Sequence, residues 1–94
     1  MRISVFGLGY VGVVSVACLS SMGHKIIGVD TNQTKVDMVN KGLSPIVEKD
    51  VENLLSQAKQ KDLLSATTSA DEAIHNSDIS LVCVGTPSTS EGSI

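Results

Sequence analysis

Apolar residues along the chain fall into short runs typical of strands and longer segments typical of helices. The short runs, bounded by turn residues, predict strands at residues 2–6, 25–29, 66–68 and 79–85. The longer segments between them predict helices at residues 10–22, 32–41, 51–61 and 69–76. Strands that alternate with helices in this way form βαβ units, which predicts a parallel sheet.

Residues with strong terminal preferences mark the ends of the predicted helices. Gly23 and Gly42 follow the first two helices, where glycine is a common stop. Asp50 stands where an N-cap of the third helix is expected. Ser69 and Glu72 have the Ser-x-x-Glu spacing of a capping box, so the fourth helix is expected to begin there.

The last predicted strand, "ISLVCVG" at 79–85, is almost entirely apolar. Such a continuous run predicts a strand that is buried on both faces, as in the middle of a parallel sheet. With right-handed crossovers, the favoured topology is a doubly wound sheet with strand order 3-2-1-4. This order is the opening part of a Rossmann fold, so residues 1–94 are expected to form the N-terminal part of such a domain, truncated before its remaining strands.

The composition limits the classes of function. The chain has 94 residues, of which 41% are hydrophobic and 18% charged, as expected for one small folded domain. The net charge is −3 and basic residues do not cluster, which argues against a nucleic-acid partner. The apolar stretches are too short to cross a membrane, and the N-terminus lacks the pattern of a secretory signal.

The two cysteines, Cys18 and Cys83, lie in apolar runs without metal-ligand spacing. They are interpreted as buried thiols that pack in the core, in a protein of the reducing cytoplasm. Neither has a neighbouring base in the sequence that would activate it, so no catalytic residue and no metal site are predicted.

Three glycines between the first strand and the first helix form the pattern Gly7-x-Gly9-x-x-Gly12. At this place in a βαβ unit, Gly7 permits a tight turn and Gly9 lets the backbone approach a pyrophosphate. Gly12 allows the helix to pack closely on the sheet. The N–H groups around Tyr10 and Val11 are then expected to face the phosphates, with the helix dipole favouring negative charge.

Asp30 ends the second predicted strand, at the position from which an acidic side chain accepts hydrogen bonds from the adenosine ribose. It would also repel a 2′-phosphate, and no arginine follows it to compensate, so NAD is preferred over NADP as the cofactor. Lys35 lies within reach of the same ribose. The residues alone leave two other readings open: Asp30 as a solvated strand end or helix cap, and Lys35 as a surface lysine.

Several stretches carry a family resemblance. "MRISVFGLGYVGVVSVACLSSMGHKIIGVD", "GLSPIVE" and "LVCVGTPS" resemble the N-terminus of the nucleotide-sugar 6-dehydrogenases, the UDP-glucose and GDP-mannose dehydrogenase family. The segments "SPIVE" and "GTPS" are most similar to members that act on GDP-mannose rather than UDP-glucose. The resemblance extends along the whole chain, which corresponds to about the first fifth of a typical member.

The resemblance implies roles for particular residues. The backbone at Tyr10 and Val11 would hold the pyrophosphate of NAD, and Asp30 and Lys35 would hold the adenosine ribose. Thr86, in the segment Val-Gly-Thr-Pro, would face the cofactor. The family usually has Glu-Pro-Gly-Leu after "PIV". Here Lys-Asp-Val follows Glu48, which leaves the role of Glu48 open.

The resemblance also implies a chemistry. Family members oxidise the C6 alcohol of a nucleotide sugar to a carboxylate in two NAD-dependent steps, through a covalent intermediate on a cysteine in a later domain. The catalytic and substrate domains would thus lie outside residues 1–94, so this segment alone is expected to be inactive. Members also associate into homo-oligomers through a central region that this segment lacks.

Two alternatives stay open. One is another NAD(P)-dependent oxidoreductase with this fold, such as a hydroxyacid dehydrogenase of the 6-phosphogluconate type. Those often carry Gly-Leu-Gly-x-Met-Gly and a basic residue after the second strand, whereas Val11 and Asp30 stand here. The other is a module that binds NAD and reports redox state without catalysis, because a fold and a cofactor site do not determine function.

Overall fold

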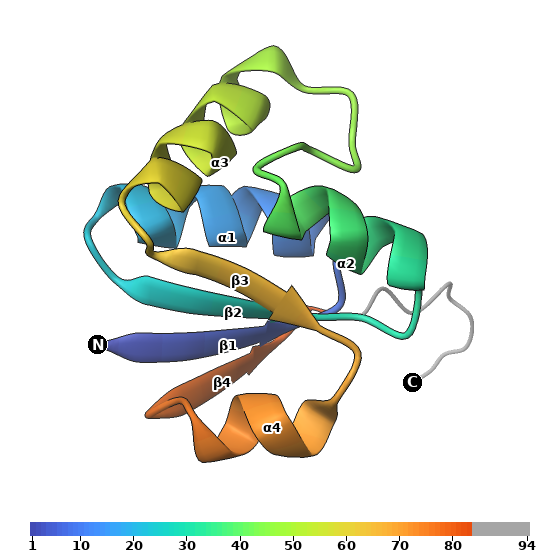
Figure 1. The fold of residues 1–94 in the computed structure, drawn as a ribbon, viewed down its shortest axis with the longest axis vertical. Coiled ribbons are helices and arrows are strands. Elements are labelled where there is room, and N and C mark those ends of the chain that lie inside the picture. Colours follow the sequence, from blue (N-terminus) through green and yellow to red (C-terminus); the bar gives the residue numbers. More distant parts are fainter. Residues whose placement is uncertain (84–94) are drawn as a thin grey trace, which may run out of the picture.

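A computed structural model describes residues 1–83, in which strands and helices alternate along the chain (Figure 1). The strands are β1 (Arg2–Phe6), β2 (Lys25–Val29), β3 (Leu64–Thr67) and β4 (Ile79–Val82). The helices are α1 (Tyr10–Ser21), α2 (Gln33–Asn40), α3 (Lys49–Gln60) and α4 (Ala70–His75). None of the helices in this part of the chain is long and apolar enough to cross a membrane.

The four strands form one parallel sheet in the order β3-β2-β1-β4, which confirms the predicted topology. Phe6, the last residue of β1, pairs with Val29 of β2 and with Val82 of β4. Val29 in turn pairs with Thr67 at the end of β3. The carboxyl ends of all four strands therefore lie together at one edge of the sheet, where α/β sheets bind their ligands.

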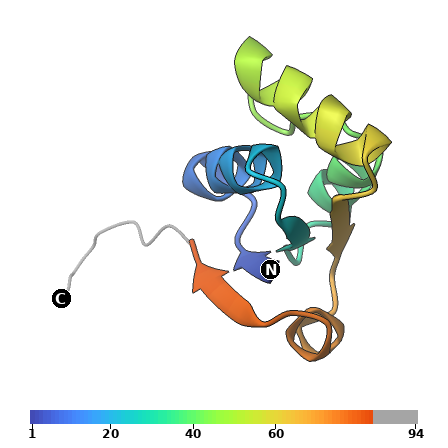
Figure 2. The ribbon, with the colours of Figure 1, turned by 90° about the vertical axis from the view of Figure 1, so that its left-hand side faces the viewer.

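The helices cover the two faces of the sheet unequally. Helices α1, α2 and α3 lie on one face and α4 on the other (Figures 1 and 2). This follows from right-handed crossovers, because the chain moves one way from β1 to β3 and the opposite way from β3 to β4. The core between the sheet and α1–α3 is mainly aliphatic, and its members with little exposure include Ile3, Val5, Leu8, Val13, Val16, Ile26, Val39 and Leu55.

Two predicted element boundaries were wrong by two residues. Strand β3 begins at Leu64 rather than at residue 66, because Leu64 already pairs with Ile26 of β2. Helix α3 begins at Lys49, with Glu48 as its N-cap residue in place of the predicted Asp50. The predicted cap of α4 is confirmed, since the Ser69 side chain accepts a hydrogen bond from the N–H of Glu72 at 3.2 Å.

The expectation that the last strand is buried on both faces was wrong for the described residues. All four residues of β4 are exposed, and Val82 keeps 72% of its accessible surface. The reason is that β4 lies at the outer edge of the sheet, paired with β1, and no helix of the described residues packs extensively over its faces. The predicted remainder of the strand, residues 84 and 85, lies outside the described part of the chain.

The prediction of two buried thiols that pack in the core was wrong for Cys18 and confirmed in part for Cys83, which packs against the core cluster. Cys18 is exposed and Cys83 is half-buried. The buried positions of α1 include Val13, Val16 and Ala17, and Cys18 lies one residue beyond them on the outer side of the helix. The sequence of α1 is apolar on all sides of the helix, so it does not indicate which side faces the sheet. The exposure of Cys18 could therefore not be predicted from its neighbours in the sequence.

The outer edge of β3 is closed by the side chain of Asn40, at the end of α2. The Asn40 amide donates to the carbonyl of Ala66 at 3.0 Å and accepts from the N–H of Ala66 at 2.8 Å. The side-chain amide thus takes the place of a peptide group on a neighbouring strand. Because these backbone groups of Ala66 are already paired, the β3 edge has fewer free N–H and C=O groups with which a strand of another chain could pair.

Helix α1 approaches the end of β1 so closely that position 12 has no room for a side chain. A Cβ atom built on Gly12 would lie 1.6 Å from the carbonyl oxygen and 2.8 Å from the carbonyl carbon of Gly7. The neighbour is backbone and cannot rotate away. The close packing predicted for Gly12 is therefore confirmed, and its partner is the backbone of the turn itself.

We expect Asn40→Ala to lower the free energy of unfolding by about 1–3 kcal/mol, because the backbone groups of Ala66 would lose both partners. Denaturant unfolding followed by circular dichroism measures the change. Asn53→Ala, at an exposed position of α3, is the matched control and should be close to neutral. Equal stabilities of the two variants would contradict a role of Asn40 at this edge.

We expect Gly12→Ala to destabilise the fold by about 1–3 kcal/mol or more, because the added methyl group overlaps the carbonyl of Gly7. Helix propensity alone predicts the opposite, a gain of roughly 1 kcal/mol. Gly9→Ala is the matched control, since a Cβ there meets no atom within 4 Å. The sign of the change in thermal stability of Gly12→Ala decides between steric overlap and propensity.

Candidate functional site

The segment Gly7–Gly9, here named the glycine loop, turns the chain from β1 into α1. Gly7 has a φ of +101°, a conformation that L side chains rarely adopt. Its N–H donates to the carbonyl of Val29 at 2.8 Å, which holds the start of the loop at the carboxyl end of β2. The tight turn predicted for Gly7 is confirmed.

Gly9 leaves open space at the N-terminus of α1. A Cβ atom at Gly9 would meet no atom within 4 Å, so the absence of a side chain is not required by packing within the described residues. The N–H of Val13 donates to the Gly9 carbonyl at 2.9 Å and begins the helical ladder, so the N–H groups of Tyr10 and Val11 precede it. The side chains of Tyr10 and Val11 are both exposed. This arrangement fits an anionic group bound against the backbone.

Leu8, between the two glycines, was not singled out in the sequence. Its side chain is fully buried and lies against Gly28 of β2, where an added Cβ would come 3.0 Å from Leu8 Cδ2. The loop is therefore anchored by an apolar contact beneath it. A glycine inside a strand often marks such a close approach, and Gly28 was the signal in the sequence that pointed to it.

Asp30 follows β2 and contacts the glycine loop directly. Its Oδ2 accepts a hydrogen bond from the N–H of Leu8 at 2.8 Å, and its Oδ1 accepts one from the N–H of Asn32 at 2.9 Å. Partial burial raises the pKa of Asp30, but these N–H donors and the positive charge of Lys35 outweigh it, so that the pKa lies below its ordinary value. Asp30 is therefore an anion at neutral pH.

Lys35 lies in the first turn of α2, whose start is determined by Asn32. The Asn32 side chain accepts hydrogen bonds from the N–H groups of Thr34 at 2.9 Å and Lys35 at 3.3 Å. This cap begins the helix three residues after β2 and holds the half-buried Lys35 close enough to influence the Asp30 carboxylate. The helix cap in this region is Asn32, so the reading of Asp30 as that cap is wrong.

A hollow of about 210 Å³ opens at the carboxyl ends of the strands. Residues from β1, the glycine loop, the end of β2 and the start of α4 line it: Phe6, Gly7, Val29, Asp30, Thr31, Thr68 and Ala70. The structure thus brings Gly7 and Asp30 together at one opening, with Gly9, Tyr10 and Val11 adjacent in the chain. Thr68 and Ala70 were not predicted as lining residues, because they follow β3 and are distant from the glycine loop in the sequence. Thr86 lies outside the described residues.

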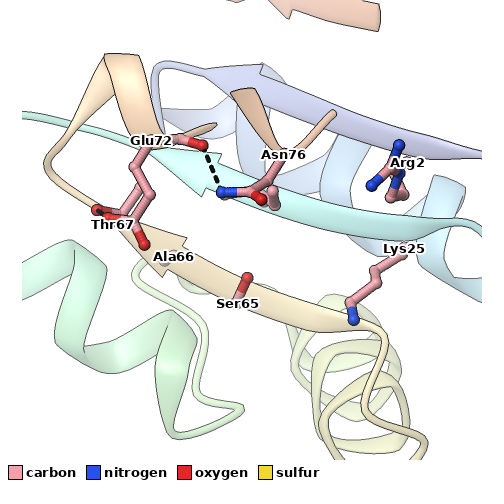
Figure 3. A pocket seen from close by; sticks show the side chains of 8 residues that line it. Arg2, Lys25, Ser65, Ala66, Thr67, Glu72 and Asn76 are labelled. Carbon is pink, nitrogen blue, oxygen red and sulfur yellow. Dashed lines mark hydrogen bonds between the residues drawn. The ribbon is translucent and has the colours of Figure 1, made fainter. Parts of the chain in front are cut away.

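A second hollow, of about 290 Å³, lies on the α4 face of the sheet (Figure 3). Arg2 and Lys25 line it from the amino ends of β1 and β2, Glu72 lines it from α4, and Asn76 lines it from the C-cap of α4. Arg2 is already paired with Asp78, at 3.2 Å between its guanidinium and the carboxylate. This hollow contains none of the glycine-loop residues and does not belong to the same site.

The remaining candidate residues lie apart from the glycine loop. Glu48 lines a hollow of about 470 Å³ at the start of α3 together with Val47 and Lys49, and no glycine-loop residue contributes to that hollow. Within residues 1–83, no three side chains of histidine, cysteine, aspartate or glutamate gather closely enough to hold a metal ion.

Comparison with known proteins identifies the family. Residues 1–94 match the model of the UDP-glucose/GDP-mannose dehydrogenase family, NAD binding domain. GDP-mannose 6-dehydrogenase of Pseudomonas aeruginosa is 54% identical over 94 residues, which are 100% of this chain and 22% of that protein. UDP-glucose 6-dehydrogenase of Bacillus subtilis is 38% identical over 92 residues, 98% of this chain and 21% of that protein.

Solved structures show the same likeness. GDP-mannose dehydrogenase from Pseudomonas aeruginosa, in a ternary complex, superposes with a TM-score of 0.92 at 56% identity, over 96% of this chain and 21% of that chain. A UDP-glucose dehydrogenase from the archaeon Pyrobaculum islandicum has a TM-score of 0.86 at 38% identity, over 92% of this chain and 20% of that chain. The chain therefore belongs to the UDP-glucose/GDP-mannose dehydrogenase family, within its NAD-binding domain, and spans about a fifth of the length of the relatives it matches.

Proposed function

We propose that the opening at the carboxyl ends of β1 and β2 holds the adenosine and pyrophosphate parts of NAD. The observation that carries this proposal is the free space at Gly9, directly in front of the N-terminus of α1. No contact within residues 1–83 requires glycine at position 9, whereas a phosphate approaching the backbone does. The membership of the NAD-binding domain family supports the identity of the cofactor.

Each proposed contact follows from the chemistry of its group. The N–H groups of Tyr10 and Val11 donate to the pyrophosphate, and the helix dipole of α1 favours the negative charge there. The Asp30 oxygens each accept one backbone hydrogen bond and keep a further lone pair for a ribose hydroxyl. Lys35, near the same carboxylate, is the donor on the ribose side.

For the whole protein, we propose oxidation of the C6 alcohol of a nucleotide sugar to a carboxylate, with GDP-mannose favoured over UDP-glucose. The preference rests on the greater identity to the GDP-mannose enzyme, 54% against 38%. NAD would supply the hydride acceptor for each of the two steps. The catalytic cysteine, the nucleotide-sugar site and the contacts of a homo-oligomer are proposed to lie beyond residue 94.

The test is a steady-state assay of the purified whole protein with NAD and each nucleotide sugar, followed by the absorbance of NADH. We expect a higher kcat/KM with GDP-mannose than with UDP-glucose. A higher value with UDP-glucose would contradict the substrate proposal while leaving the chemistry intact. NAD binding without turnover of either sugar would favour the hydroxyacid-dehydrogenase or NAD-sensing alternatives.

In the whole protein, Gly9→Val is expected to abolish NAD binding and leave the fold intact. The isopropyl group would occupy the space proposed for the pyrophosphate, and a Cβ at this position contacts no atom of the described part of the chain within 4 Å. Calorimetric titration with NAD and thermal unfolding measure the two properties. Ser21→Val, at the exposed opposite end of α1, is the control for the added side chain. Unchanged NAD affinity of Gly9→Val would refute the proposed site.

Asp30 is expected to make the protein prefer NAD to NADP. Like charges about 4 Å apart repel by roughly 4 kcal/mol at an effective dielectric of 20, and solvent screens part of this for a half-exposed carboxylate. We expect Asp30→Asn, which removes the charge, to narrow the preference on the order of tenfold. Titration of NAD and of NADP into the unaltered protein and into Asp30→Asn measures the ratio of the two affinities in each protein. Equal affinity of the unaltered protein for NAD and NADP would exclude this role of Asp30.

A further inference from the structure

The Asp30 carboxylate is bonded to the glycine loop before any ligand is considered. Its Oδ2 accepts the N–H of Leu8 at 2.8 Å, across 22 residues of sequence, while its Oδ1 accepts the N–H of Asn32 at 2.9 Å. One oxygen thus closes a local turn into α2 and the other reaches the segment between β1 and α1. A residue that only bound ribose would not need the second contact.

The same loop residue is held from a second direction. The side chain of Leu8 is fully buried against Gly28, two residues before Asp30 on β2. Leu8 is therefore held by two contacts. Its side chain packs against Gly28 of β2, and its N–H donates to Asp30 directly after β2. Since Gly9 and the N-terminus of α1 follow immediately in the chain, these two contacts determine where the phosphate-facing backbone lies.

We propose that Asp30 is a positioning residue for the glycine loop, so that it supports binding of the pyrophosphate as well as of the ribose. This inference rests on the proposed function of the opening as the NAD site. Hydrogen bonds from N–H groups to a carboxylate are stronger than those to a neutral acceptor, which suits a residue that must hold a loop in place. Binding of the pyrophosphate then depends on Asp30, which holds the glycine loop in position.

Electrostatics alone predict the opposite effect of Asp30 on a phosphate. A carboxylate near an anionic ligand repels it, so removal of the charge should strengthen the binding of pyrophosphate. A positioning role predicts weaker binding when the bond to Leu8 is lost, despite the removal of the repulsion. The sign of the change therefore separates the two roles.

Two neutral substitutions provide a matched pair. Asp30→Asn keeps the length of the side chain and one acceptor oxygen. When that oxygen accepts from the N–H of Leu8, the amide NH2 faces the N–H of Asn32 and the contact to Asn32 is lost. Asp30→Ser keeps a hydroxyl that can close the short turn to the Asn32 N–H, as serine does in such turns, but it is too short to reach Leu8. Both variants remove the same charge and each keeps one of the two backbone contacts of Asp30, the contact to Leu8 in Asp30→Asn and the contact to Asn32 in Asp30→Ser. Serine also retains the start of α2, which protects the fold.

The experiment is calorimetric titration of the whole protein and both variants with inorganic pyrophosphate, which has no ribose. Thermal unfolding verifies that each protein is folded at the assay temperature. We expect Asp30→Asn to bind pyrophosphate at least as tightly as the unaltered protein, and Asp30→Ser to bind it on the order of fivefold more weakly. Equal affinities of the two variants, whether raised or lowered, would overturn the inference.

Titration with NAD separates this inference from the proposed function. If the unaltered protein binds NAD while Asp30→Ser and Asp30→Asn bind pyrophosphate equally, the site stands and the positioning role of Asp30 is wrong. If the unaltered protein binds neither NAD nor pyrophosphate, the proposed function fails, and the inference fails with it.

Discussion

The contact between the Gly12 backbone and the carbonyl of Gly7 is the constraint on which this structure depends. A single methyl group at position 12 would overlap the Gly7 oxygen, at 1.6 Å. Without that side chain, α1 can start immediately after the turn and lie directly on the central strands. The positive φ of Gly7 then reverses the chain within the few residues available. The N-terminus of α1 is thus presented at the same edge of the sheet as the carboxyl end of β2.

Strand β2 acts as the fixed reference for the glycine loop. The carbonyl of Val29 accepts a hydrogen bond from the N–H of Gly7, and the Leu8 side chain packs against Gly28. Asp30, directly after the strand, accepts a hydrogen bond from the N–H of Leu8. These contacts lie on both sides of the loop. A negative carboxylate and a positive helix terminus therefore stand next to each other, and each favours a different part of a dinucleotide, hydroxyls for the former and phosphates for the latter.

The two edge strands of the sheet, β3 and β4, differ in how far other groups cover them. At β3, the amide of Asn40 pairs with both backbone groups of Ala66, because an amide side chain offers one donor and one acceptor like a peptide group. At β4, the residues Ile79–Val82 are exposed in the described part of the chain. Within residues 1–83, the sheet β3-β2-β1-β4 is therefore covered by a side-chain amide at its β3 edge and exposed at its β4 edge.

The parallel order of the strands and the places of Gly7, Gly9, Gly12 and Asp30 could be predicted from the sequence, since hydrophobic period and glycine spacing are local properties. The tertiary structure alone decided which groups from distant segments meet. The bond from Leu8 to Asp30, the contact of Leu8 with Gly28 and the closure of β3 by Asn40 each join residues 20 or more positions apart. Burial was equally a tertiary matter, because an apolar sequence is the same on an outer helix face, as at Cys18, or at a sheet edge, as in β4. A residue's own neighbours along the chain describe its periodicity, whereas only the packing of other elements determines what covers it.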